Sequence, residues 1–224
     1  MRRPNFREEK KLRKKGLKFI AGIDEAGRGP LAGPVIAAAT IVATAKTRNP
    51  KPETRKLLKE INDSKKLSPK KREEIFKIIE KNPSIKWGIG KVSERVIDRI
   101  NIKNAAELAM EKAVVNLEKK IKRKIDFLII DGNHLRNLKL KTYNLKLMPK
   151  ADEKVFSCAL SSIVAKVTRD KIMLEYHKKY PSYCFDRHKG YGTKLHFKLL
   201  RKYGPSVIHR QTFNPLRKMI KYNK

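Results

Sequence analysis

The chain has 224 residues, of which 56 are Lys or Arg and 22 are Asp or Glu, so its formal net charge at pH 7 is +34. A hydrophobic fraction of 40% argues against a wholly disordered chain, and the length suits one domain with a sizeable core. The basic excess favours a polyanionic partner such as a nucleic acid, although a lysine-rich composition also follows from a genomic or thermal bias.

Cysteine usage and hydropathy indicate a reduced, cytoplasmic protein. Cys158 and Cys184 are the only cysteines, and they have no metal-ligand spacing. No charged start leads into an apolar signal core, and the longest apolar stretch, residues 31–45, is shorter than the ~20 residues that span a bilayer. We therefore expect no membrane association, and we expect a monomer.

The first predicted elements are a basic arm and a pair of strands. Residues 1–18 are highly charged and have no clear apolar period, which predicts a flexible or weakly helical arm. No repeat, low-complexity spacer or long linker divides residues 19–224, so we expect one domain there. Within it, apolar runs at 19–24 and 34–44 flank a glycine-rich turn and predict a hairpin-like pair.

Strands and helices then alternate along the chain. Ser68 is typical of a helix N-cap, and Pro69 suits the first helical position. Further strands are predicted at 85–92, before Asp131 and at 143–148, and further helices at 104–124 and 153–180. This alternation predicts an α/β fold with a mixed sheet and helices on its faces, followed by a basic loop and a short helix.

Asp24 and Asp131 each stand at the end of an apolar strand, beside a glycine-containing turn. If these strands are neighbours, the two carboxylates meet at one edge of the sheet, where open α/β sheets place their ligands. Like charges this close require a proton or a cation between them. Because no His or Cys cluster lies nearby in the sequence, Mg²⁺ or Mn²⁺ suits the pair better than zinc.

Two further acids have competing interpretations. Successive strand side chains point to opposite faces, so Glu25 joins the same centre as Asp24 only if the chain bends there or if its carbonyl contributes. Asp152 precedes a predicted helix, and because Asp is a favoured N-cap, capping competes with metal binding. Structural ion pairs are the alternative for the whole set. In a chain this poor in acids, the pattern nevertheless indicates a two-metal phosphoryl-transfer site.

Six motifs follow one another along the chain: GIDEAGRGPLAGPV, DSKKLSPKKRE, IIDGN, SSIVAKVTRD, HKGYGTKLH and IHRQTFNP. In this order they resemble the signature of ribonuclease HII, the type 2 ribonuclease H family, over most of residues 18–216. The resemblance implies an RNase H-like fold with a mixed five-stranded sheet, flanking helices and a helical C-terminal part. It also implies Mg²⁺- or Mn²⁺-dependent endonucleolytic cleavage of the RNA strand of RNA/DNA hybrids. Nicking on the 5′ side of a single ribonucleotide in duplex DNA, leaving 3′-hydroxyl and 5′-phosphate ends, is implied as well.

The resemblance also assigns roles to individual residues. The implied catalytic and metal-binding acids are Asp24, Glu25, Asp131 and Asp152. The implied sensor of the ribose 2′-hydroxyl, acting through its backbone, is Gly27, Arg28 and Gly29. Tyr191 corresponds to the family's tyrosine at the RNA–DNA junction, although a tyrosine in such a loop is more often a packing residue. The candidates for phosphate contact, each more often a solvated charge, are Lys65, Lys66, Lys166, Arg169, His188 and Lys189.

Some features depart from the family, and two other classes compete. Ala151 stands before the fourth acid, where many bacterial members have Gly, which puts the local loop geometry in question. The basic arm and the net charge also exceed the family's expectation. A non-catalytic basic RNA-binding protein on the same fold is disfavoured, because four acids without a metal would repel phosphate. Another nuclease or recombinase on this fold would not need a 2′-hydroxyl sensor.

Overall fold

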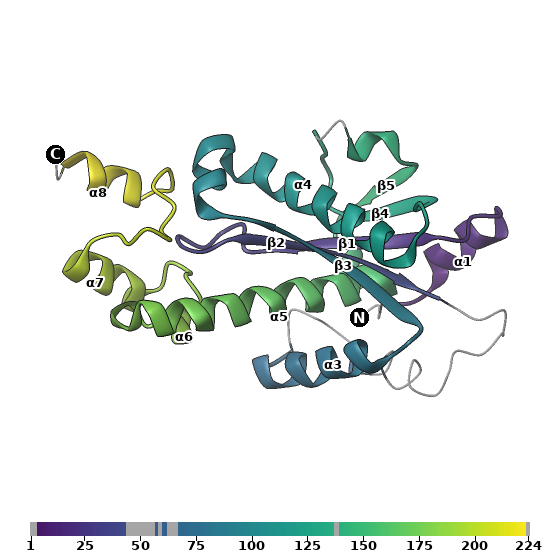
Figure 1. The fold of residues 1–224 in the computed structure, drawn as a ribbon, viewed down its shortest axis with the longest axis horizontal. Coiled ribbons are helices and arrows are strands. Elements are labelled where there is room, and N and C mark those ends of the chain that lie inside the picture. The colour runs from purple at the N-terminus through teal and green to yellow at the C-terminus, as the bar shows by residue number, and fades with distance from the viewer. Residues whose placement is uncertain (1–3, 44–56, 58–59, 62–66, 137–138, 223–224) are drawn as a thin grey trace.

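The computed structural model describes residues 4–43, 57, 60–61, 67–136 and 139–222 (Figure 1). Five strands form one sheet in the spatial order β3-β2-β1-β4-β5. β1 pairs antiparallel with β2 and parallel with β4, so the sheet is mixed, as predicted. The strands are β1 Ile20–Ala26, β2 Val35–Val42, β3 Ile85–Val92, β4 Phe127–Asp131 and β5 Leu145–Met148.

Helices cover both faces of the sheet (Figure 1). The α-helices are α1 Arg7–Lys14, α3 Pro69–Lys81, α4 Glu94–Ile121, α5 Phe156–Lys179, α6 Phe185–His188, α7 Lys194–Tyr203 and α8 Leu216–Tyr222. Short 3-10 turns occur at Leu140–Thr142, Ala151–Glu153 and Pro181–Tyr183. Among the described residues, none of these helices is long and apolar enough to cross a membrane.

The two faces of the sheet carry separate apolar cores because strand side chains alternate. Ile23 and Ala37 belong to the core beneath α4, whereas Ile36 and Ala38 belong to the core beneath α5 and α3. Gly22 brings β1 close to the start of α5, since a Cβ on this residue would lie 2.4 Å from the backbone nitrogen of Cys158 in α5. Because side chains alternate along the strand, Asp24 points to the same face as Gly22, toward α5.

The C-terminal part is helical, as predicted. α5 extends past the sheet, and α6, α7 and α8 gather around its far end (Figure 1). A third core fills this region, with Met173, Phe185, Leu200 and Leu216 fully buried. Leu31, from the turn between β1 and β2, packs into the same core. The glycine-rich turn is thereby joined to the C-terminal helices.

The N-terminal segment differs from the expected flexible or weakly helical arm. α1 packs against the start of α5, with Leu12 buried and the Phe6 ring 4.7 Å from the Phe156 ring. Glu9 is also buried, and it accepts hydrogen bonds from the Ser157 backbone nitrogen at 3.1 Å and hydroxyl at 2.9 Å. The sequence did not predict these contacts, because α1 buries only Glu9 and Leu12 and is otherwise highly charged.

The helix predicted at 104–124 begins earlier than expected. α4 starts at Glu94 and includes a kink at Asn101, whose φ is 63° and ψ is 164°. The Asn101 side chain then accepts hydrogen bonds from the backbone nitrogens of Lys103 and Asn104, as at a helix start. The predicted start therefore coincides with this internal kink, and a preceding helical segment was missed.

Candidate active site

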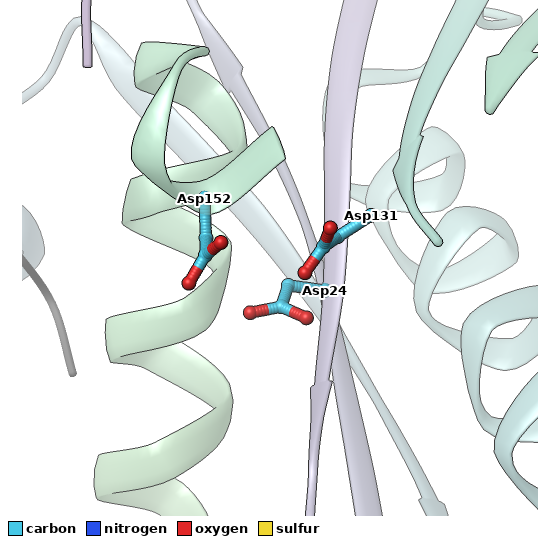
Figure 2. Close-up of side chains that lie close together, drawn as sticks. All are labelled: Asp24, Asp131 and Asp152. Carbon is cyan, nitrogen blue, oxygen red and sulfur yellow. The ribbon is translucent and has the colours of Figure 1, made fainter. Parts of the chain in front are cut away.

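Asp24, Asp131 and Asp152 converge from three different elements, and Figure 2 shows their carboxylates pointing toward one another. Asp24 lies in β1, Asp131 ends β4, and Asp152 lies in the short turn before α5. One carboxylate oxygen from each residue lies within 4.8 Å of the others. Asp24 and Asp131 meet because β1 and β4 are parallel neighbours that pair Ile23 with Ile130. The sequence prediction that these two acids share an edge of the sheet is confirmed.

Burial makes this cluster electrostatically costly. Asp24 is 6% exposed and Asp152 is 1% exposed. Burial raises the pKa of Asp24 well above its ordinary value, and the nearby charges of Glu25 and Asp131 raise it further. A hydrogen bond with the Ser162 side chain acts in the opposite direction. The site thus favours a proton or a cation among its carboxylates.

The turn before α5 places two of the acids relative to each other. The Ala151 backbone nitrogen donates a hydrogen bond of 2.9 Å to Asp131 Oδ1. Val155, and not Asp152, occupies the N-cap position of α5. The capping interpretation of Asp152 is therefore wrong, because this residue lies within the 3-10 turn Ala151–Glu153, ahead of the cap.

Glu25 stands apart from the three clustered acids. The strand register continues without a break from Asp24, opposite Ala38, to Glu25, opposite Ala37, so the bend that was one of the two conditions for Glu25 to join the centre is absent. Glu25 Oε1 instead lies 2.9 Å from Arg28 Nη1. Burial raises the pKa of Glu25, whereas the Arg28 guanidinium lowers it. A role for Glu25 as a fourth metal ligand stays a prediction.

A cleft of ≈ 380 Å³ opens over the acids. Its lining residues are Asp24, Glu25, Ala26, Gly27, Arg72, Asp131, Ser162, Lys166 and Tyr191. Lys166 Nζ lies 2.8 Å from Asp170 Oδ1, and Arg72 Nη1 lies 3.8 Å from Asp170 Oδ2. The predicted Lys166 thus lies at the site. Sequence reasoning missed Arg72 and Ser162, because Arg72 reaches the cleft through the packing of α3 beside α5 and Ser162 through the packing of α5 on β1.

The glycine turn, residues 27–34 between β1 and β2, has one crowded and one open position. Gly27 has a φ of +98°, and a Cβ there would lie 2.3 Å from Arg169 Nε, so only glycine fits. A Cβ on Gly29 would meet no atom within 4 Å. The Arg28 side chain is about half exposed, with 51% of its surface accessible. The outer side of this turn is therefore free to approach a ligand.

Arg169 does not have the phosphate-binding position that the sequence suggested. Its side chain is fully buried, and it donates hydrogen bonds of 3.0 Å to the carbonyl oxygens of Pro34, Ala32 and Lys189. All three guanidinium nitrogens donate to backbone carbonyls, so the correction follows from hydrogen bonding as well as burial. Arg169 joins the glycine turn to the loop that carries Tyr191.

His188 also differs from the expected phosphate contact. It is 7% exposed, its Nδ1 accepts a hydrogen bond from the Gly190 nitrogen, and its Nε2 lies 2.7 Å from the Tyr183 carbonyl oxygen. Lys189 is half-buried and donates to the Asp186 carbonyl oxygen. Both residues thus stabilise the loop 183–190 through its own backbone and do not point to a phosphate.

Tyr191 is the most exposed aromatic side chain at the site, with 39% of its surface accessible. Lys166 Nζ lies 5.3 Å from the centre of its ring. The two remaining candidates, Lys65 and Lys66, lie outside the described residues. Tyr191, Lys166 and the acids therefore share one cleft.

A cluster of carboxylates at the edge of an RNase H-like sheet, beneath a cleft flanked by cations, defines a nuclease-type site. Residues 21–215 match the sequence profile of the family described as Ribonuclease HII. The ribonuclease HII of Caldicellulosiruptor bescii is 46% identical over 208 residues, which cover 93% of this chain and 92% of that protein. The ribonuclease HII of Caldanaerobacter subterraneus subsp. tengcongensis is 49% identical over 205 residues, covering 92% and 78% respectively. The chain belongs to the ribonuclease HII family.

Solved structures agree with this assignment. The crystal structure of ribonuclease H2 from Pyrococcus horikoshii OT3 superposes with a TM-score of 0.69 and 25% identity, covering 91% of this chain and 97% of that one. A structure of Bst-RNase HIII in complex with Mn²⁺ has a TM-score of 0.66 at 18% identity, covering 92% and 70%, and shows the shared fold. The protein is accordingly a ribonuclease H of type HII, an enzyme class that acts on RNA/DNA hybrids.

Proposed function

We propose that this enzyme cuts the RNA strand of RNA/DNA hybrids and also nicks duplex DNA on the 5′ side of a single ribonucleotide, leaving 3′-hydroxyl and 5′-phosphate ends. The observation that carries the proposal is the convergence of Asp24, Asp131 and Asp152, of which Asp24 and Asp131 line a cleft that also presents Tyr191. Clustered carboxylates suit many phosphoryl transfers. The open Gly29 position and the exposed Tyr191 add surfaces that suit a sugar, and the 2′-hydroxyl distinguishes RNA from DNA.

The donor set fits Mg²⁺ or Mn²⁺. The three clustered residues offer carboxylate oxygens within 4.8 Å of one another, and these hard cations prefer oxygen ligands. Burial and then the neighbouring carboxylates raise the pKa of Asp24, and a bound cation would stabilise its charged form. We propose that Asp24, Asp131 and Asp152 hold the metal, with Glu25 as a fourth ligand of a two-metal site. When bound, the cations supply Lewis-acid stabilisation of the charge that develops on the phosphate.

The remaining residues of the cleft orient the substrate. Lys166 and Arg72 place positive charge beside the acids, where a backbone phosphate must approach. The Tyr191 ring offers a face for packing on a sugar, and its hydroxyl supplies a hydrogen-bond partner for the 2′-hydroxyl. The pair formed by Glu25 and Arg28 ties the glycine turn to the acidic edge. A cytoplasmic location and a monomeric state stay predictions.

The proposal is tested by incubating an RNA/DNA hybrid, labelled on its RNA strand, with Mg²⁺, with Mn²⁺ or with chelator. Internal cuts are expected with either cation and none with chelator, while an all-DNA duplex stays intact. Asp24→Asn and Asp131→Asn are expected to bind the hybrid without cutting it. Binding without cleavage by the wild-type protein under both cations would overturn the proposal in favour of a non-catalytic RNA-binding protein.

A further inference from the structure

Three buried histidines connect the C-terminal segment to the loop of Tyr191. His188, His196 and His209 are all less than one-tenth exposed. The rings of His188 and His196 stack with centres 4.2 Å apart, and His196 Nε2 lies 3.0 Å from His209 Nε2. At the ends of this chain, His209 Nδ1 contacts Ser206, and His196 Nδ1 lies 3.0 Å from the Tyr191 carbonyl oxygen.

The hydrogen bonds determine the tautomer of each ring. A backbone N–H can only donate, so the bond of 2.9 Å from the Ser206 nitrogen makes His209 Nδ1 an acceptor and leaves the ring proton on Nε2. That proton points to His196 Nε2, which must accept it. The proton of His196 then lies on Nδ1 and is donated to the Tyr191 carbonyl oxygen. The two neutral rings thus form a directed chain from Ser206 to Tyr191.

Burial keeps this chain neutral. Burial first, and then the neighbouring histidines, lower the pKa of His196 to about 4 and the pKa of His209 to about 3. His188 is a separate branch, because the Gly190 N–H donates to its Nδ1 and leaves its Nε2–H for the Tyr183 carbonyl oxygen. Near neutral pH, each ring therefore has one proton with a defined acceptor.

The loop of Tyr191 needs such an anchor. Gly190 and Gly192 flank Tyr191, and Gly190 has a φ of +85°. Arg169 Nη1 and the Leu31 nitrogen hold the carbonyl oxygens of Lys189 and Gly190 at 3.0 Å and 2.8 Å, so the Tyr191 carbonyl is the next point at which the loop can be fixed. The Tyr191 carbonyl oxygen also accepts a bond of 2.8 Å from the Thr193 nitrogen. The His196 ring uses the remaining lone pair and connects this carbonyl to α7.

We propose that His196, held by His209, is a positioning residue that fixes the main chain at Tyr191 so that the tyrosine ring stays over the cleft. This inference rests on the proposed function, in which Tyr191 contacts the ribonucleotide. The next residue after His209 is Arg210, which donates to the Gly27 and Arg28 carbonyl oxygens. Two consecutive residues therefore brace the two elements assigned to ribose recognition.

Variants of His196 separate its two hydrogen bonds. His196→Asn keeps an amide donor where Nδ1 lies and loses the link to His209, whereas His196→Phe removes both bonds. We expect H196F to lower kcat/KM for a duplex containing one ribonucleotide by about ten- to a hundredfold, the scale of a small misplacement of a substrate contact. H196N is expected to recover most of this loss. His177→Asn, at a half-exposed histidine of α5, is the matched control and should match the wild type.

A double-mutant cycle distinguishes positioning from general stability. If His196 acts through Tyr191, H196F should cost little further activity in a Tyr191→Ala background. An equal loss in both backgrounds would overturn the proposal. Thermal unfolding identifies any variant that fails to fold, and the tautomers of the wild-type rings then carry the test.

The tautomers give a readout that needs no activity. Nitrogen-15 NMR of the wild-type imidazoles at pH 7 should show His209 protonated on Nε2 and His196 on Nδ1. A proton on His196 Nε2 would overturn the proposal even in an active enzyme. A wild-type protein with the expected tautomers but no cleavage of any ribonucleotide substrate would instead refute the proposed function.

Discussion

Arg210 Nη2 lies 2.6 Å from the Gly27 carbonyl oxygen, and the same buried guanidinium also reaches the carbonyls of Arg28 and Gly33. Burial first, and then the charge of Arg169, lower the pKa of Arg210 to about 9. The turn therefore has its carbonyls directed inward onto a cation. This arrangement leaves its outer side available to a ligand.

Removing this guanidinium should destabilise the fold. Arg210→Ala leaves three buried carbonyls without their donor, and each such group costs about 1–3 kcal/mol. We expect the free energy of unfolding, measured by urea denaturation, to fall by at least about 3 kcal/mol. Arg201→Ala, at an exposed position of α7, is the control and should stay within about 0.5 kcal/mol of the wild type. Equal stability of the two variants would show that Arg210 does not hold the turn.

Asp24→Asn should abolish cleavage while stabilising the metal-free protein. The pKa of Asp24 is raised by burial and by neighbouring carboxylates, so between its unfolded and folded pKa values the folded state binds more protons. Stability of the metal-free protein therefore falls as the pH rises through this window. The uncharged variant avoids that loss. Urea denaturation in chelator from pH 4 to pH 8 should give a higher unfolding free energy for D24N at the upper end, and parallel curves would contradict the prediction.

Added Mg²⁺ should make the wild type more stable than D24N, the reverse of their order in chelator. A cation that binds only the folded state stabilises it in proportion to the logarithm of its concentration. The melting temperature of the wild type should rise with Mg²⁺, whereas that of D24N should rise less. An identical rise in both proteins would place the cation elsewhere.

The buried histidines predict a loss of stability in acid. The folded pKa values of His196 and His209, about 4 and about 3, lie below the ordinary value of 6.5. Between these limits the unfolded state binds more protons, so their contribution to stability falls as the pH drops below 6.5. His196→Asn cannot titrate, and its unfolding free energy should decline less between pH 7 and pH 5. A decline as steep as in the wild type would contradict neutral burial of His196.

Lys166→Ala should weaken binding to all duplexes. Loss of one phosphate contact reduces the salt dependence of the binding constant by about one unit of slope, without regard to sequence. Fluorescence anisotropy in the D24N background measures this without cleavage. Lys124→Ala, at the opposite end of β4 from the acids, is the control and should leave the slope unchanged. If the salt dependence of K166A equals that of the control, Lys166 does not contact a phosphate.

Local patterns predicted the framework of the site. Ser68 caps α3 as expected, with its Oγ accepting from the Lys71 nitrogen at 3.2 Å, and the strand predicted at 85–92 matches β3. The meeting of Asp24 with Asp131 followed from apolar runs that end beside glycines. Each of these features depends on a few adjacent residues.

Features that depend on distant contacts were beyond the sequence patterns. Arg169 and His188 were expected at the surface because of their charge and polarity, but carbonyl groups from other segments satisfy them inside the protein. For Asp152 the residues alone slightly favour a cap over a metal ligand, since the 3-10 turn that contains it has no strong signature. Residue type indicated which groups carry chemistry, whereas tertiary packing decided which of them face the cleft.

The most direct test of ribonucleotide recognition uses a DNA duplex with one ribonucleotide in a 5′-labelled strand, beside an identical all-DNA duplex. With Mg²⁺ or Mn²⁺ we predict a single nick on the 5′ side of the ribonucleotide, with a 3′-hydroxyl on the labelled product. The all-DNA duplex should stay intact. Cutting of both duplexes, or of neither, would contradict the assignment of this cleft to recognition of a 2′-hydroxyl.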